Sequence, residues 1–196
     1  MYADVSCAWC LPNRLASAYG DIPLASIGIV LKLERIPVNI GLGVCLGMVP
    51  LIAYNYGAGN KERVKKVSNL ARNTIIVFAV ACALIFGLLA PQLMRCFIKD
   101  AETVKCGVTF LTGRCASLPF MMIGYHVVNY MNAVGEGKTS FFLAVLRHLI
   151  LLVPAMLIMN ALLGMDGLVF SQLVADVINS AAAVAIYIRI SRKQFK

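Results

Sequence analysis

Two acidic residues stand inside long apolar stretches of the sequence, and they are the first candidates for chemistry. Glu34 interrupts the stretch IGIVLKLERI, and Asp176 interrupts GLVFSQLVADVI. If these stretches cross a bilayer, a carboxylate in them is costly and usually faces protein or a water-filled cavity. Such a group can bind a cationic solute or exchange a proton. The alternatives are a structural ion pair and a charge that extends to the membrane interface.

Polar residues close to Glu34 form a pattern of their own. Lys32, Arg35 and Asn39 recur at positions i, i+3 and i+7, so they share one face of a helix. Glu34 points about 100° away from Arg35, and we expect it to meet another helix or a solute. We group these four residues with Asp176 as candidate cation- or substrate-binding residues.

Two later apolar segments each carry a polar stripe at the spacing i, i+4, i+7. The stripes are Tyr125, Asn129 and Asn132 in one segment and Gln172, Asp176 and Asn179 in the other. Stripes of this kind line a wet cavity or form hydrogen bonds from helix to helix. We predict cavity lining and keep helix–helix bonding as the alternative.

Motifs of soluble enzymes are missing from the sequence. We find no GxSxG, no HExxH and no phosphate-binding loop, so no enzymatic activity and no cofactor are predicted. The two histidines lie far apart without a cysteine or acid at ligand spacing, so no metal site is predicted. Cys7 and Cys10 form a lone CxxC, which leaves a membrane thiol oxidoreductase as an alternative.

The composition indicates that a lipid bilayer surrounds most of the chain. Of the 196 residues, 60% are hydrophobic and 14% are charged, and the mean hydropathy is +0.82. Soluble domains average roughly 45–50% apolar and about 25% charged residues. A net charge of +9 could suggest nucleic acid, but the basic residues cluster between and after apolar runs, so membrane topology explains them better and no nucleic-acid partner is predicted.

Six apolar segments, separated by short turns rich in Gly, Asn and Asp, predict an all-α, polytopic membrane protein with a six-helix bundle. Most approach or exceed the roughly 20 residues that a spanning helix needs. Long runs without alternation exclude barrel strands. No linker divides the chain, which we treat as a single lobe, 1–196. The predicted spans are 3–19, 22–56, 67–93, 104–134, 140–163 and 167–190.

Lysine and arginine are distributed unevenly between the two sides of this bundle. Eleven fall on one side, which receives Lys61, Arg63, Lys65, Lys66, Arg72, Lys138, Arg147, Arg189, Arg192, Lys193 and Lys196, and four fall on the other, Arg95, Lys99, Lys105 and Arg114. The positive-inside rule places the richer side, with the C-terminus, in the cytoplasm. Arg63, Lys65, Lys66 and Arg147 are the predicted cytoplasmic anchors.

The second segment admits two interpretations because LKLER at 31–35 interrupts it. One is a loop between two shorter spans. The other is a single tilted helix about 50 Å long, at ~1.5 Å per residue. Only the single helix preserves the charge distribution described above.

Several motifs together carry a resemblance to a known family. GLGVCLGMVPLIAYNYGAGNKERVKK, NAVGEGKTS, LRHLILLVPAML and GMDGLVFSQLVAD follow one another in order and spacing over roughly residues 14–190. They resemble the eighth helix, the turn after the tenth helix, and the eleventh and twelfth helices of the multidrug and toxic compound extrusion (MATE) family, in its bacterial branch.

The resemblance implies the C-terminal six-helix lobe of a twelve-helix transporter in a bacterial cytoplasmic membrane. It implies export of amphipathic or cationic solutes in exchange for H⁺ or Na⁺, together with a missing N-terminal lobe or a second copy. Asp176 matches the acid of the twelfth helix, and Arg147 matches an arginine of the eleventh. The tenth-helix equivalent lacks the carboxylate found in some members. The alternative is a truncated remnant that inserts into the membrane without transporting.

Overall fold

The structure is a computed structural model that describes residues 19–194. The predicted first span, 3–19, and the Cys7–Cys10 pair therefore lie outside the described residues, apart from Tyr19 at the end of that span. Every regular element in the described part of the chain is helical. The predicted all-α fold is confirmed.

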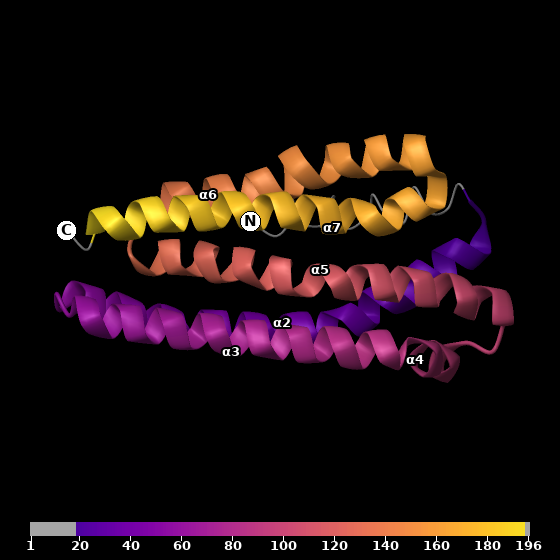
Figure 1. Cartoon of the computed structure of the whole chain (residues 1–196), viewed down its shortest axis with the longest axis horizontal. Helices are drawn as coiled ribbons and strands as arrows, with labels where there is room; N and C mark the ends of the chain where they lie inside the picture. The colour runs from indigo at the N-terminus through magenta and orange to yellow at the C-terminus, as the bar shows by residue number, and fades with distance from the viewer. Residues whose placement is uncertain (1–18, 195–196) are drawn as a thin grey trace.

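The described elements form an elongated bundle (Figure 1). The order along the chain is α2 (Asp21–Gly57), α3 (Lys61–Leu88), α4 (Ala90–Phe97), α5 (Ala101–Ala133), α6 (Gly137–Val145), the π-helical segment η1 (Leu146–Leu152) and α7 (Val153–Gln194). Helix α5 occupies the middle of the bundle and packs against α2, α3 and α7. It therefore carries the largest share of buried residues.

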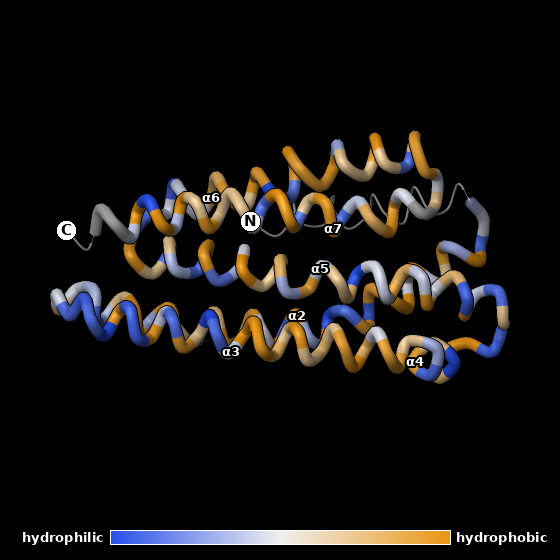
Figure 2. The backbone as a smooth tube through the Cα atoms, in the orientation of Figure 1, coloured by the Kyte–Doolittle hydropathy of each residue, from blue (hydrophilic) through white to orange (hydrophobic). Residues whose placement is uncertain are grey.

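Five helical stretches in residues 19–194 are long and apolar enough to cross a membrane: Asp21–Gly57, Lys61–Leu88, Ala101–Ala133, Gly137–Met165 and Gly167–Ser191. The last two belong to α6, η1 and α7, and they are separated by a bend beside Gly164, where φ 59 and ψ −132 break the helix. Figure 2 shows apolar residues along much of the length of these helices, with polar residues at the ends of the bundle and at separate places within it. The chain is therefore a multi-pass membrane protein.

Helix α2 is continuous from Asp21 to Gly57, so the 31–35 stretch lies within one long helix. Its buried residues recur every three or four positions and face α5. They include Ile27, Val30, Glu34, Pro37 and Gly41. Glu34 thus occupies a position on this stripe where an apolar residue would otherwise pack.

The turn after α2 explains the sequence YGAGN. Gly59 adopts a positive φ of 73°, which costs glycine little. Asn60 then caps α3, because its side-chain oxygen accepts a hydrogen bond from the backbone N–H of Arg63 at 3.1 Å. Helix α3 therefore begins at Lys61, several residues before the predicted 67, and the basic stretch forms its first turns.

The predicted span 67–93 is divided in the structure. Helix α3 ends at Leu88, and Pro91 lies in the first turn of α4, where proline's missing N–H costs little. Figure 1 draws α4 nearly end-on while the long helices run across the page, so α4 lies across the bundle axis. Hydropathy alone did not reveal this change of direction.

The α2–α3 turn, the α5–α6 turn and the C-terminal end of α7 all lie at one end of the bundle, and α4 and the bend in α7 lie at the other (Figure 1). This grouping is compatible with the predicted charge distribution. Arg114 is an exception, because it lies well inside α5 rather than in a connection.

Candidate functional site

A cavity of about 420 Å³ lies between α2, α5, η1 and α7. Apolar side chains form much of its wall, including Leu31, Val38, Met121 and Met156. The polar and charged lining residues are Glu34, Arg35, Asn39, Arg114, Tyr125, Arg147, His148, Ser171, Gln172 and Asp176. Charged groups from four segments thus meet inside the membrane-spanning part of the chain.

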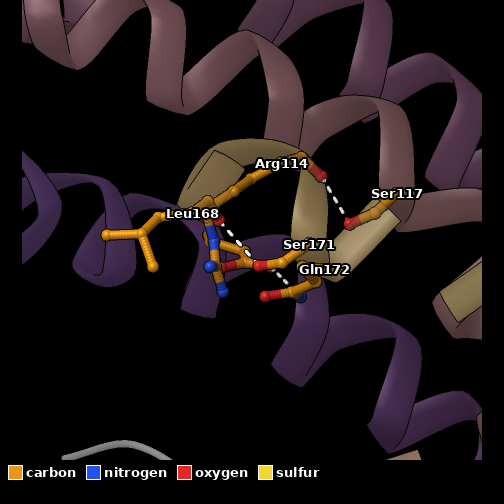
Figure 3. Close-up of polar contacts among 6 residues, drawn as sticks. Arg114, Ser117, Leu168, Ser171 and Gln172 are labelled. Carbon is orange, nitrogen blue, oxygen red and sulfur yellow. Dashed lines mark hydrogen bonds and ion pairs between the residues drawn. The ribbon is translucent and has the colours of Figure 1, made fainter. Parts of the chain in front are cut away.

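Glu34 is the centre of the first polar cluster in this cavity. Its side chain is 5% exposed. Arg114 of α5 donates from Nε to Glu34 Oε2 at 2.5 Å, and Gln172 of α7 donates from Nε2 to Glu34 Oε1 at 3.3 Å. Figure 3 shows the Arg114 and Gln172 side chains meeting in this region. One carboxylate therefore connects three helices.

Two serines next to this cluster bond to their own helices. Ser117 donates to the carbonyl oxygen of Arg114 at 2.8 Å, and Ser171 donates to that of Leu168 at 2.9 Å (Figure 3). Hydroxyl groups in membrane helices commonly satisfy themselves in this way. Their protons are therefore not used to hold Glu34.

Arg147 and Asp176 form the second polar cluster. Arg147 Nε lies 2.8 Å from Asp176 Oδ1, and the two side chains are 10% and 2% exposed. The Arg147 guanidinium also lies 4.9 Å from the centre of the Tyr125 ring, a distance at which a cation is attracted to the aromatic face. Arg147 belongs to the π-helical segment η1, and π-helical turns are frequent at functional sites.

Two buried oxygens beside this pair have no hydrogen-bond partner: Asp176 Oδ2 and Asn179 Oδ1. The two residues are one helical turn apart on α7. A Cβ atom at Gly124 of α5 would lie 2.9 Å from Asn179 Nδ2, so the two helices approach closely here. Buried polar atoms are normally paired. The Asp176 carboxylate can accept a proton, and both oxygens can accept a hydrogen bond or coordinate a small cation.

The structure brings most of the predicted binding residues together but separates some. Glu34, Arg35, Asn39, Tyr125, Gln172 and Asp176 all line the cavity. Lys32 and Asn132 are exposed and lie outside it, and Asn179 is buried outside its lining. Asn129 is buried outside it too, and donates from Nδ2 to the carbonyl oxygen of Tyr125 at 2.9 Å.

The predicted anchors also separate into two groups. Arg63, Lys65 and Lys66 are exposed in the first turns of α3, where an anchor would lie. Arg147 is buried and paired with Asp176, which differs from the exposed position expected for an anchor. Asp176 stabilises the buried guanidinium, and sequence spacing alone does not reveal that partner.

Arg114 is the cavity residue that sequence reasoning missed. From the sequence, Arg114 is grouped with the basic residues on the less basic side of the bundle. Arg114, Met121 and Tyr125 recur at i, i+7 and i+11 and all line the cavity, and this spacing puts them on one helix face. That spacing, together with a charge inside an apolar segment, was the available signal.

A separate buried cluster lies nearer the α2–α3 turn and was not expected either. The Ser68 hydroxyl of α3 lies 3.3 Å from His126 Nε2 and 3.2 Å from the Tyr187 hydroxyl. Tyr187 also packs edge-on against Tyr130, with ring centres 4.9 Å apart. These contacts tie α3, α5 and α7 together. Among residues 19–194, no three His, Cys, Asp or Glu side chains are grouped as a metal site.

Comparison with known proteins identifies relatives of this chain. The MatE family profile matches residues 10–158. Multidrug export protein MepA of Staphylococcus saprophyticus is 33% identical over 174 residues, which are 89% of this chain and 38% of that protein. MepA of Staphylococcus aureus strain N315 is 34% identical over the same share of each chain. The chain thus spans well under half the length of the curated relatives it matches.

Solved structures share the fold of the lobe. The MATE transporter VcmN of Vibrio cholerae in the bent form superposes with a TM-score of 0.88 at 20% identity, covering 96% of this chain and 43% of that one. An outward-facing MATE transporter gives 0.90 at 18% identity, covering 97% and 44%. An inward-facing one gives 0.89 at 17% identity, covering 97% and 45%. These likenesses concern the fold.

The family profile matches well over half of the chain, and the named relatives are transporters rather than enzymes, as the sequence predicted. The chain belongs to the MatE family of multidrug and toxic compound extrusion proteins.

Proposed function

We propose that this chain forms one lobe of an ion-coupled antiporter in a bacterial cytoplasmic membrane, which exports amphipathic or cationic solutes in exchange for H⁺ or Na⁺. The observation that carries the proposal is the cavity in which Glu34 and Asp176 are buried within the spanning helices. Ionisable groups at such depth are costly and are usually retained for a function. The named export proteins among the relatives support the same direction of transport.

Each acid in this cavity already has a cationic partner from the protein. Arg114 neutralises Glu34, and Arg147 neutralises Asp176. A cationic solute therefore binds by competing with a guanidinium, and release of the solute restores the internal pair. Gln172 also donates to Glu34. It can keep this hydrogen bond whether the carboxylate is paired with Arg114 or with the solute.

The coupling ion is proposed to act at Asp176 and Asn179. Their unpaired buried oxygens supply hard acceptors, which suit a proton on the carboxylate or Na⁺ between the two oxygens. Protonation of Asp176 would weaken its attraction for Arg147 and free that side chain. Either ion thereby changes the contact between η1 and α7.

A second lobe or a second copy of the chain is part of the proposal. Arg35 and Asn39 lie near the middle of α2, line the cavity, and are exposed in this chain. Polar side chains at membrane depth face protein or water rather than lipid. Transporters built from repeats bind substrate at the interface between the repeats. The lobe fits outward-facing and inward-facing relatives equally well, which supports movement as one body.

The orientation follows from the charges at the bundle ends. We propose that the α2–α3 turn, with Arg63, Lys65 and Lys66, lies in the cytoplasm together with the C-terminus. The positive-inside rule favours this arrangement.

Binding of ethidium, a fluorescent lipophilic cation, tests the proposal on the purified chain in lipid nanodiscs. Replacing Glu34 with Gln removes a charge-assisted contact, so affinity should fall roughly tenfold to hundredfold. Lower pH or added Na⁺ should also weaken binding, and Asp176→Asn should abolish that ion dependence. Glu102→Gln is the matched control, because Glu102 is an exposed acid in the first turn of α5.

Equal ethidium affinity in the native chain and in well-folded Glu34→Gln would overturn the assignment of this cavity. No binding at all would favour the alternative of a chain that inserts into the membrane without transporting. Sustained, gradient-dependent ethidium efflux by a monomer in cells would contradict the need for a second lobe or copy.

A further inference from the structure

A second cavity, of about 650 Å³, lies at the opposite end of the bundle from the α2–α3 turn, between α4 and the start of α5. We call it the basic groove. It is lined by Pro91, Arg95, Lys99, Ala101, Val104, Lys105, Val108 and Thr109. It shares no residue with the cavity around Glu34, and the proposed transport function makes no use of it.

Positive charge dominates the basic groove. Arg95, Lys99 and Lys105 are exposed, and its lining contains no acid. The ion pairs Glu34–Arg114 and Arg147–Asp176 involve none of these three residues. Three like charges around one hollow repel one another and attract an anion.

The acids nearest to the groove in the sequence form no ion pair with its three basic side chains. Asp100 is engaged in capping α5, because Thr103 donates to Asp100 Oδ2 from its backbone nitrogen at 2.8 Å and from its hydroxyl at 2.6 Å. Glu102 is exposed and does not line the groove. Within residues 19–194, Arg95, Lys99 and Lys105 therefore have no ion-pair partner that would compete with an anion.

The position of the groove identifies the kind of anion. Helix α4 lies across the bundle axis, at the end of the spanning helices (Figure 1). It buries Ala90 and Met94 against the bundle. Leu88 and Phe97, which end α3 and α4, are 78% and 55% exposed. Basic and apolar groups thus occur together at this end of the spanning helices, where we expect lipid headgroups to meet acyl chains.

We propose that the basic groove binds the phosphate of an anionic phospholipid headgroup. Arg95, Lys99 and Lys105 contact the phosphate. The acyl chains run along the exposed apolar side chains at the ends of α3 and α4. A free phosphate ion shares the headgroup's charge, but it gains nothing from those apolar side chains, so the lipid is the favoured occupant.

Photocrosslinking in proteoliposomes tests the proposal with a local readout. The native chain is reconstituted with a photoactivatable phosphatidylglycerol, and adducts are mapped by mass spectrometry. We expect adducts between residues 90 and 109. Unlabelled phosphatidylglycerol should compete for them, whereas phosphatidylcholine and inorganic phosphate should not.

Substitutions test whether the charge of the three basic residues is the cause of the labelling. Each basic side chain near an anionic lipid surface raises the binding affinity about fivefold. The triple variant Arg95→Gln/Lys99→Gln/Lys105→Gln should therefore need roughly a hundredfold more phosphatidylglycerol for equal labelling. The variant Arg95→Lys/Lys99→Arg/Lys105→Arg keeps the charge and should label normally. Lys61→Gln/Arg63→Gln/Lys66→Gln removes the same charge at the other end of the bundle and should leave these adducts unchanged.

Three results would overturn the assignment. Equal labelling of residues 90–109 by a phosphatidylcholine probe would show that charge does not select the occupant. Undiminished labelling in the folded triple variant would exclude the three basic residues. Competition by inorganic phosphate as strong as that by phosphatidylglycerol would identify a free-phosphate site instead.

Discussion

Replacing one member of the Arg147–Asp176 pair should destabilise the protein far more than replacing both. Asp176→Asn keeps the size of the side chain but leaves the Arg147 guanidinium buried without a counter-ion. Arg147→Met leaves the Asp176 carboxylate in the same position, with Oδ2 already unpaired. The double variant Arg147→Met/Asp176→Leu removes both charges and leaves apolar side chains in the space.

The expected magnitude follows from the burial of the pair. The two side chains are 10% and 2% exposed, so water screens their attraction weakly. Opposite charges about 4 Å apart attract by ~4 kcal/mol at an effective dielectric constant of about 20. A buried charge that loses its partner costs about 3–5 kcal/mol, whereas replacing both charges by well-packed apolar groups is often close to neutral.

Equilibrium unfolding in mixed micelles measures these differences. The chain is titrated with sodium dodecyl sulfate, and helix content is followed by circular dichroism for the native chain and the three variants. Each single variant should lose about 3–5 kcal/mol of unfolding free energy, and the double variant should lie within roughly 1 kcal/mol of the native chain. The coupling energy of the cycle is then about 5 kcal/mol or more.

Arg63→Met is the matched control for loss of an arginine. Arg63 is exposed in the first turn of α3, so its replacement should change the unfolding free energy by less than about 0.5 kcal/mol. If the two single effects simply add in the double variant, the pair is not energetically coupled. The buried, weakly screened ion pair would then be the wrong description of this part of the cavity.

Two further predictions concern packing and capping. Gly113→Ala should cost about 1–3 kcal/mol in the same unfolding assay, because its Cβ would lie 2.2 Å from Val169 Cγ1, whereas Gly43→Ala has open space and should not destabilise. The hydrogen bonds from Thr103 lower the pKa of Asp100 from 3.8, so its stabilisation of α5 is complete above that pH and is lost as the pH falls through the lowered value. Hydrogen-exchange protection of the first turn of α5 should fall in acid for the native chain but not for Asp100→Asn.

The fold could be predicted well because hydropathy reports directly on the bilayer. Long apolar runs predict spanning helices, and α2 is indeed one helix across its charged 31–35 stretch. The boundaries were harder to predict. Helix α3 begins at Lys61 because the side chain of Asn60 caps it, although lysine and arginine favour a loop on hydropathy. Helix α4 was missed because eight residues are too few to show a change of direction in a hydropathy pattern.

The sequence predicts the two acids of the candidate site but not the residues that pair with them. Glu34 and Asp176 are conspicuous because each is an acid in an apolar stretch. Their partners are 80 and 29 residues away along the chain, and only tertiary packing brings them together. The count of basic residues on each side groups Arg114 with the less basic side and Arg147 with the cytoplasmic anchors, and it does not reveal that each arginine is buried beside an acid.

The two ion pairs differ in which helices they hold, and this difference connects ion binding to shape under the proposed function. Glu34 joins α2 to α5 and α7, whereas Asp176 joins α7 to η1. A cation that takes Glu34 from Arg114 loosens the first junction, and a proton or Na⁺ at Asp176 loosens the second. Because both junctions share α7, each ligand changes the free energy of the arrangement that the other binds, which is what coupling between two sites requires. Under this proposal, the solute cation replaces Arg114 at Glu34, and H⁺ or Na⁺ replaces Arg147 at Asp176. These two replacements are sufficient to link solute binding to ion binding within one lobe.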